Sequence, residues 1–139
     1  MAAPNCVFCK IVAGKIPCLR VYEDPSVLAF LDIGPLAEGH LLVIPKDHAE
    51  RLEDMPTDIL AHLVRQLPPL ARAVLKVTAT DSYNLLQNNG KTSGQEVPHV
   101  HFHIIPRKAA DGLGYRWLAS SYPAGRGEEI RRQLVAALA

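Results

Sequence analysis

Residues 99–104 read His-Val-His-Phe-His-Ile, with an imidazole at every second position. In a β-strand, successive side chains point to opposite faces, so His99, His101 and His103 would line one face at intervals of about 7 Å. The apolar residues between them would then enter the core. A buried strand has no structural need for three polar rings on its other face. We therefore predict a site there that uses imidazole chemistry.

Spacing alone leaves two other interpretations of these histidines open. The three rings could form a solvated face of a sheet. They could also bind a metal ion, because imidazole nitrogen is a common ligand of zinc.

The composition is that of an ordinary globular protein, with 48% apolar and 21% charged residues in 139. We expect one domain over residues 1–139. A formal net charge of +1 gives no support for nucleic acid or a membrane as a partner. The N-terminus lacks the pattern of a signal peptide and no apolar run reaches about 18 residues, so we expect a cytoplasmic location. The three cysteines do not make a disulfide framework, and Cys18 is expected to be an ordinary thiol.

Apolar periodicity and turn residues divide the chain into eight expected elements. Helices are expected at 6–13, 57–78 and 127–138, and strands at 19–24, 26–33, 39–46, 81–88 and 97–107. This order predicts an α+β fold: a five-stranded, mostly antiparallel sheet with one long helix and short terminal helices.

The long helix carries a broad apolar stripe, which indicates one buried face. The stripe consists of Ile59, Leu60, Leu63, Leu67, Leu70, Val74 and Val77. Pro68 and Pro69 lie within it and should kink or divide the helix. His62 lies off the stripe and is predicted to be a surface residue. Trp117, further along the chain, could belong to the core, to an interface or to a lip over a site.

The loop before the histidines, residues 88–96, contains Gly90 and Gly94 among polar residues. Glycine allows backbone conformations that turn successive N–H groups towards one ligand, and such nests bind phosphate. Many polar loops with two glycines bind nothing. Beside three imidazoles, however, the loop suggests a phosphate held against a histidine.

Residues 88–107, NNGKTSGQEVPHVHFHIIPR, resemble the signature of the histidine triad nucleotide-binding family. Three earlier segments resemble the family in order and spacing: NCVFCKIVAGKIP at 5–17, VYEDPSVLAFLDIGP at 21–35 and GHLLVIPKDH at 39–48. The resemblance covers about residues 5–107 and leaves 108–139 as a C-terminal extension. It implies the fold of that family and a homodimer.

The resemblance implies a nucleophile at the middle histidine, His101. It would attack the α-phosphorus of a nucleotide derivative and form a nucleotidyl-histidine, which water hydrolyses. His103 would donate a hydrogen bond to the phosphoryl oxygens as charge develops there. His40 matches a further histidine that helps to orient the site, although it could also be a histidine of the core.

The same resemblance implies how a nucleotide is bound. Asp32 would accept hydrogen bonds from both ribose hydroxyls, and Asn88 would lie near the phosphate. The loop N–H groups of Gly94, Gln95, Glu96 and Val97 would bind phosphate oxygens. The base would be enclosed by apolar residues, each of which could equally be a core residue: Phe8, Ile11, Ile16, Phe30 and Ile33.

Asp32 and Asn88 resemble the purine-phosphoramidase branch of the family, which implies hydrolysis of AMP or GMP derivatives at a P–N bond. The alternatives are a dinucleoside polyphosphate hydrolase, a nucleotidyltransferase and a nucleotide-binding interaction protein without a catalytic role. Glu96 departs from the serine or threonine of many members, and it receives no role in assisting the leaving group.

Cys6 and Cys9 have a spacing common among zinc ligands. Such a pair alone could also be redox-active. Some branches of the family have a Cys-Cys-His-His arrangement, and His48 and His99 match its two histidines. The resemblance thus implies a structural zinc ion that fixes the N-terminal segment to the sheet.

Overall fold

The computed structural model describes residues 2–114 and 118–138, so Trp117 lies outside the described residues. The elements in chain order are α1 (Val7–Val12), β1 (Arg20–Glu23), β2 (Val27–Leu31), β3 (Leu41–Pro45), the 3₁₀ helix η1 (Leu52–Asp54), α2 (Thr57–Thr78), β4 (Ser82–Gln87), the 3₁₀ helix η2 (Lys91–Ser93), β5 (Phe102–Arg107) and α3 (Arg126–Leu138). No helix among these residues has the length and apolar character needed to cross a membrane.

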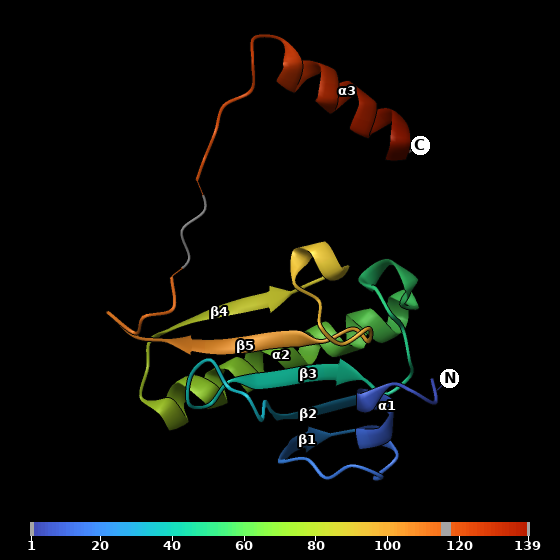
Figure 1. Cartoon of the computed structure of the whole chain (residues 1–139), viewed down its shortest axis with the longest axis vertical. Coiled ribbons are helices and arrows are strands. Elements are labelled where there is room, and N and C mark those ends of the chain that lie inside the picture. Colours follow the sequence, from blue (N-terminus) through green and yellow to red (C-terminus); the bar gives the residue numbers. More distant parts are fainter. Residues whose placement is uncertain (1, 115–117, 139) are drawn as a thin grey trace.

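The five strands form one sheet in the order β1-β2-β3-β5-β4, and all neighbours are antiparallel. The predicted α+β fold and its antiparallel sheet are therefore confirmed. In the register of the sheet, His103 of β5 lies between Leu42 of β3 and Leu86 of β4. β5 is therefore an inner strand, with β3 on one side and the edge strand β4 on the other (Figure 1).

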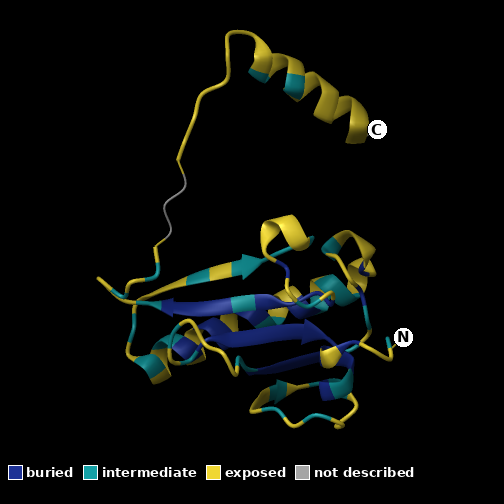
Figure 2. Ribbon diagram, in the orientation of Figure 1, coloured by how far each residue is buried: buried dark blue, intermediate teal, exposed yellow. Residues whose placement is uncertain are grey.

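Both faces of the sheet are covered, as alternation along β2 shows. Val27 and Ala29 join a core cluster against α2, whereas Leu28 and Phe30 join a second cluster with residues of α1. Figure 2 shows the resulting dark-blue central strands, buried on both sides. The short helix α1 therefore lies on the face of the sheet opposite α2. The candidate site described below is on the α1 face.

Helix α2 has the predicted bounds but differs from the prediction in two respects. Pro68 and Pro69 do not divide it, since α2 is continuous from Thr57 to Thr78. Both prolines lie on its exposed side, where the lost backbone hydrogen bonds leave carbonyls open to water. The stripe also ends one turn earlier than predicted, because Val77 is 84% exposed.

Strand β5 begins at Phe102, five residues later than predicted, so His99 and His101 precede the strand. In this segment the Val100 N–H donates to the carbonyl of Ala49 at 2.8 Å rather than to a neighbouring strand. The alternation of faces nevertheless continues through the irregular segment. Val100, Phe102 and Ile104 all enter the cluster against α2.

The C-terminal extension begins after Arg107, the last residue of β5, and hydrogen bonds of Arg107 fix its first residues. Its guanidinium donates to both carboxylate oxygens of Asp111, at 2.7 and 3.0 Å, and to Asn84 Oδ1 at 2.6 Å. Further along, α3 has no buried residue. Figure 1 shows α3 lying away from the sheet.

Candidate functional site

A cavity of about 470 Å³ opens on the α1 side of the sheet. Its lining includes every residue predicted to bind the nucleotide except Gln95. Residues that the sequence did not single out also line it, namely Val7, Pro17, Cys18, Gly34, Leu36, Leu42, Leu86 and Ile105. No periodicity could have identified them, because they come from separate elements that meet only in the folded sheet.

One part of the cavity is apolar and could enclose a flat base. The rings of Phe8 and Phe30 meet edge to face, with centroids 5.6 Å apart. Ile11 and Ile16 line the same cavity, and Ile33 lines it while remaining 92% exposed. Exposed isoleucine at the mouth leaves apolar surface that a bound base would cover.

His101 lies on the cavity wall with one ring nitrogen already occupied. Its Nδ1 is 2.7 Å from the backbone carbonyl of His99. A carbonyl only accepts, so Nδ1 carries the hydrogen, and Nε2 has the lone pair in the neutral ring. The ring of Phe8 packs edge-on against it at 5.1 Å. The ring is therefore held through one nitrogen and keeps the lone pair of the other for a ligand.

His40 and His103 form a hydrogen-bonded chain that begins at the Leu36 N–H. This amide determines which ring nitrogen carries the hydrogen in both histidines. The Leu36 N–H donates to His40 Nδ1 at 3.1 Å, so His40 carries its hydrogen on Nε2. That nitrogen lies 2.9 Å from His103 Nδ1 and donates to it. His103 must then carry its own hydrogen on Nε2, where it can donate to a ligand in the cavity.

Burial keeps this pair neutral. It lowers the pKa of His103 to about 4, with further lowering from His101 and His40. Burial also lowers the pKa of His40, although the carboxylate of Asp32 opposes this. Both rings are therefore neutral near pH 7, as the assigned hydrogen bonds require.

Asp32 lies beside His40, with Oδ2 3.7 Å from His40 Nε2. Its other oxygen, Oδ1, accepts from the Gly34 N–H at 2.8 Å, which orients the carboxylate. Each carboxylate oxygen has two lone pairs, so both retain capacity for a ligand's hydroxyl groups.

The loop of residues 88–96 requires glycine at two positions. Gly90 has φ 93° and Gly94 has φ 104°, in the region that side chains disfavour. Gln95 is buried, accepts from the Gly90 N–H at 2.7 Å and donates to the carbonyl of Glu50 at 2.7 Å. The side chain of Gln95 thus braces the loop, and Gln95 does not line the cavity, so its contact with a nucleotide stays a prediction.

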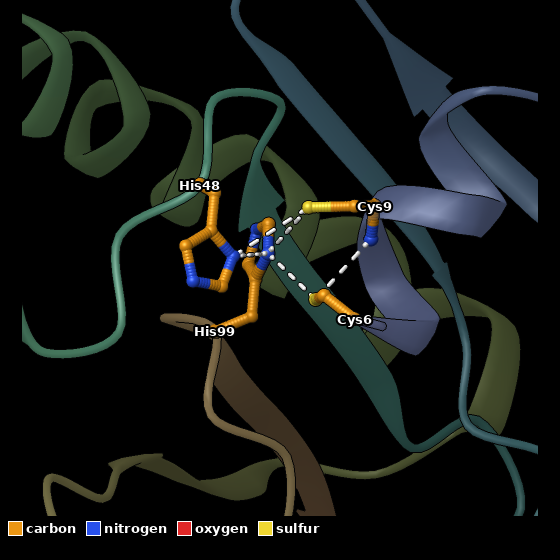
Figure 3. A group of neighbouring side chains, drawn as sticks. All are labelled: Cys6, Cys9, His48 and His99. Carbon is orange, nitrogen blue, oxygen red and sulfur yellow. Dashed lines mark hydrogen bonds between the residues drawn. The ribbon is translucent and has the colours of Figure 1, made fainter. Parts of the chain in front are cut away.

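Cys6, Cys9, His48 and His99 converge beside the cavity, with ligand atoms all within 4.8 Å of one another (Figure 3). The Cys6 and Cys9 Sγ atoms are 3.3 and 3.6 Å from His99 Nδ1, and Cys9 Sγ is 3.5 Å from His48 Nδ1. The two Nδ1 atoms are 3.2 Å apart. A tetrahedral zinc ion would separate such ligand atoms by roughly 3.3–3.8 Å.

The hydrogen bonds around this cluster also suit a metal. His99 Nε2 donates to the Pro45 carbonyl at 2.8 Å, which leaves the Nδ1 lone pair facing the sulfurs. Burial lowers the pKa of His99 to about 4, which keeps its ring neutral as metal binding requires. Burial raises the pKa of the Cys6 thiol, which by itself opposes the thiolate form. The cluster lies at the N-terminus of α1, where the Cys9 N–H donates to Cys6 Sγ at 3.4 Å.

His62, the sixth histidine, belongs neither to the cavity nor to the cluster of Cys6, Cys9, His48 and His99. Its Nε2 lies 2.7 Å from Asp24 Oδ2, and its side chain is 39% exposed. The prediction of a surface residue holds, with an ion-pair partner that the sequence did not indicate.

Comparisons with known proteins match residues 13–110 to the HIT domain. An adenosine 5′-monophosphoramidase of Schizosaccharomyces pombe is 46% identical over 128 residues, which are 91% of each chain. An adenylylsulfatase of Arabidopsis thaliana is 47% identical over 117 residues, 84% of this chain and 58% of the plant protein. A HIT family crystal structure from Bacillus subtilis superposes with a TM-score of 0.92 at 41% identity, covering 97% of this chain and 98% of that one. The chain therefore belongs to the HIT family, as the histidine motif indicated.

Proposed function

We propose that this protein hydrolyses purine nucleoside 5′-phosphoramidates at the P–N bond through a nucleotidyl intermediate on His101. The observation that carries the proposal is the pair of ring nitrogens facing the cavity. His101 offers the lone pair of Nε2, because Nδ1 donates to the His99 carbonyl, and His103 offers an N–H. A nucleophile beside a hydrogen-bond donor is what displacement at a phosphorus atom requires.

In the first half-reaction, His101 Nε2 forms a bond to the α-phosphorus and the P–N bond to the amine breaks. The amine nitrogen takes the bonding pair and a proton from water, and leaves as a free amine. The His99 carbonyl stabilises the positive charge that develops on the ring, because it accepts from Nδ1–H. His103 Nε2–H stabilises the phosphoryl oxygens.

In the second half-reaction, water attacks the same phosphorus and the bond to His101 breaks. The water oxygen becomes a phosphate oxygen, its proton passes to solvent, and His101 returns to its neutral form. The products are a nucleoside monophosphate and an amine.

The cavity supports a nucleotide as substrate. Phe8 and Phe30 would enclose the base, and Asp32 would accept from the ribose hydroxyls. The loop that includes Asn88, Gly94 and Val97 would bind the phosphate. Relatives named adenosine 5′-monophosphoramidase support adenosine in particular.

We also propose a structural zinc ion bound by Cys6, Cys9, His48 and His99. The ligand distances and the free Nδ1 of His99 support it. With four protein ligands the coordination shell is complete, so the ion would hold α1 against the sheet and leave catalysis to His101. Metal analysis of protein purified without a tag should find about one equivalent, and less than about half an equivalent would contradict the proposal.

A homodimer in the cytoplasm completes the proposal. The exposed apolar side chains of Tyr83 and Leu85 on the edge strand β4, and of Val77 at the end of α2, support a second copy as partner. Light scattering after gel filtration should give twice the mass of the chain, whereas a monomer at micromolar concentration would contradict it.

Steady-state hydrolysis of an adenosine 5′-phosphoramidate, compared with diadenosine tetraphosphate and adenylyl sulfate, tests the reaction itself. Adenylyl sulfate is included because of the relative named adenylylsulfatase. We expect the phosphoramidate to be cleaved with the highest kcat/KM. If a polyphosphate or the sulfate is preferred, the nucleotidyl-histidine can stand but the P–N assignment is wrong. If AMP binds and none of the three is cleaved, a nucleotide-binding interaction protein is the better description.

A further inference from the structure

A second groove, of about 840 Å³, lies beside the nucleotide cavity and has no place in the reaction described so far. Two residues, Gly94 and Glu96, line both spaces. The groove therefore adjoins the nucleotide cavity at the C-terminal end of the loop of residues 88–96. A substrate whose nucleotide fills the first cavity would extend its leaving group past Glu96 into the second.

Charged side chains from two segments line this groove. Arg51 and Lys91 supply two cations, and Glu50 and Glu96 supply two carboxylates. The guanidinium of Arg51 lies against the backbone of Gly90, since a Cβ built at Gly90 would be 2.6 Å from Arg51 Nη2. Its single ion pair among the described residues is a long contact of 3.5 Å with the exposed Glu53, so most of its hydrogen-bonding capacity is open.

The groove is also held in shape. Gln95 ties the loop to the carbonyl of Glu50, and Asn89 Oδ1 accepts from the Leu52 N–H at 2.8 Å. These bonds cross-link the segment that carries Arg51 to the loop that carries Lys91. Pre-organised charges bind a ligand with a smaller loss of conformational entropy than mobile ones.

We infer that the groove is a leaving-group subsite for amines that carry a carboxylate, an inference that rests on the proposed phosphoramidate reaction. The leaving-group carboxylate would pair with Arg51 and Lys91. Glu96, at the junction, would accept from the N–H of the scissile P–N bond. A carboxylate can accept from that N–H, whereas a bridging oxygen has no hydrogen to offer.

The test compares two adenosine 5′-phosphoramidates, one of β-alanine and one of β-alaninamide, which differ in the charge at the far end. We expect wild type to prefer the acid about tenfold in kcat/KM, mainly through KM, because the contact is with a non-reacting group. The preference should fall as salt is added. In R51Q/K91Q it should fall to about one, with hydrolysis of the amide unchanged, whereas R51K/K91R should keep it.

The matched control is R72Q/K76Q, which removes two exposed cations from α2, outside the groove. It should retain the preference of wild type. An acid-to-amide ratio near one in wild type, or an undiminished ratio in R51Q/K91Q, would overturn the subsite and leave the reaction standing. If R51Q/K91Q instead loses only hydrolysis of diadenosine tetraphosphate, the groove binds phosphate and the carboxylate assignment is wrong. If wild type cleaves neither phosphoramidate, the proposed function fails together with the subsite.

Discussion

Two groups of imidazoles lie on the α1 side of the sheet and present opposite ring nitrogens. In the cysteine-containing group, His99 donates from Nε2 to the Pro45 carbonyl and turns Nδ1 towards the sulfurs. In the cavity, His101 donates from Nδ1 to the His99 carbonyl and leaves Nε2 free. The rings are two residues apart in sequence, and Phe8 packs edge-on against both.

The difference shows that a backbone carbonyl, rather than the side chain, decides what each histidine can do. A neutral imidazole has one donor and one acceptor, so the nitrogen that is held fixes the chemistry of the other. His99 thereby presents Nδ1 to the proposed metal ion, and His101 presents Nε2 to the proposed phosphorus atom. The two groups are also connected, since the carbonyl that orients His101 belongs to His99.

The largest effect is expected from His101→Ala, which changes the cavity and leaves the cysteine-containing group intact. This variant lacks the proposed nucleophile, so hydrolysis of an adenosine 5′-phosphoramidate should fall at least ~10³-fold, about 4 kcal/mol of transition-state stabilisation. Metal content should not change. His62→Ala, outside both groups, is the matched control and should keep full activity. More than a tenth of the activity remaining in His101→Ala would disprove the assignment.

On the metal side, Cys9→Ser should lower the free energy of unfolding by about 3 kcal/mol, because serine does not replace a thiolate on zinc. Urea unfolding and metal analysis on the same samples measure this. Cys18→Ser is the control, since that thiol lines the nucleotide cavity and not the cluster. Equal stability and metal content in the two variants would show that the cluster holds no structural metal.

The low pKa of His103 should make the stability of the fold depend on pH below neutrality. Its pKa is about 4 in the fold and about 6.5 when unfolded. Between these values the unfolded chain binds more protons, so stability falls as pH decreases from 6.5 to 4, by about 2 kcal/mol from this ring. NMR titration of the histidine Cε1–H signals measures it directly. A midpoint for His103 near pH 6.5 would contradict the buried, neutral pair.

His40→Gln should lower kcat roughly 10- to 100-fold, because the hydrogen bond that fixes the proton on His103 Nε2 is weakened. KM should change less than kcat, since His40 acts through His103. The pH dependence of kcat separates this role from loss of packing. An unchanged kcat would mean that His40 is a residue of the core only.

The smallest effect is expected at Asp32, where the comparison concerns binding rather than chemistry. Asp32→Asn should reduce the preference for a ribonucleoside over its 2′-deoxy analogue by about tenfold, with kcat little altered. The ratio of kcat/KM for the two substrates measures it. Equal discrimination by wild type and variant would place the ribose elsewhere.

The elements could be predicted well because local patterns determine them. Short apolar runs bounded by turn residues identified β2 and β3, and the period of apolar residues identified α2 with its bounds. The errors arose where tertiary contacts decide. Val77 continues the apolar stripe in sequence but is 84% exposed in the fold, and β5 starts late because the Val100 N–H donates to Ala49 rather than to a neighbouring strand.

Residue types and spacing indicated the groups to which the chemistry is assigned in the proposed function: three alternating histidines, a loop with two glycines, and a cysteine pair. The arrangement of their protons was decided only by the tertiary structure. The Leu36 N–H and the carbonyls of Pro45 and His99 select the reactive nitrogen of each ring. Every residue has these backbone groups, so no sequence pattern marks the ones that fold against an imidazole.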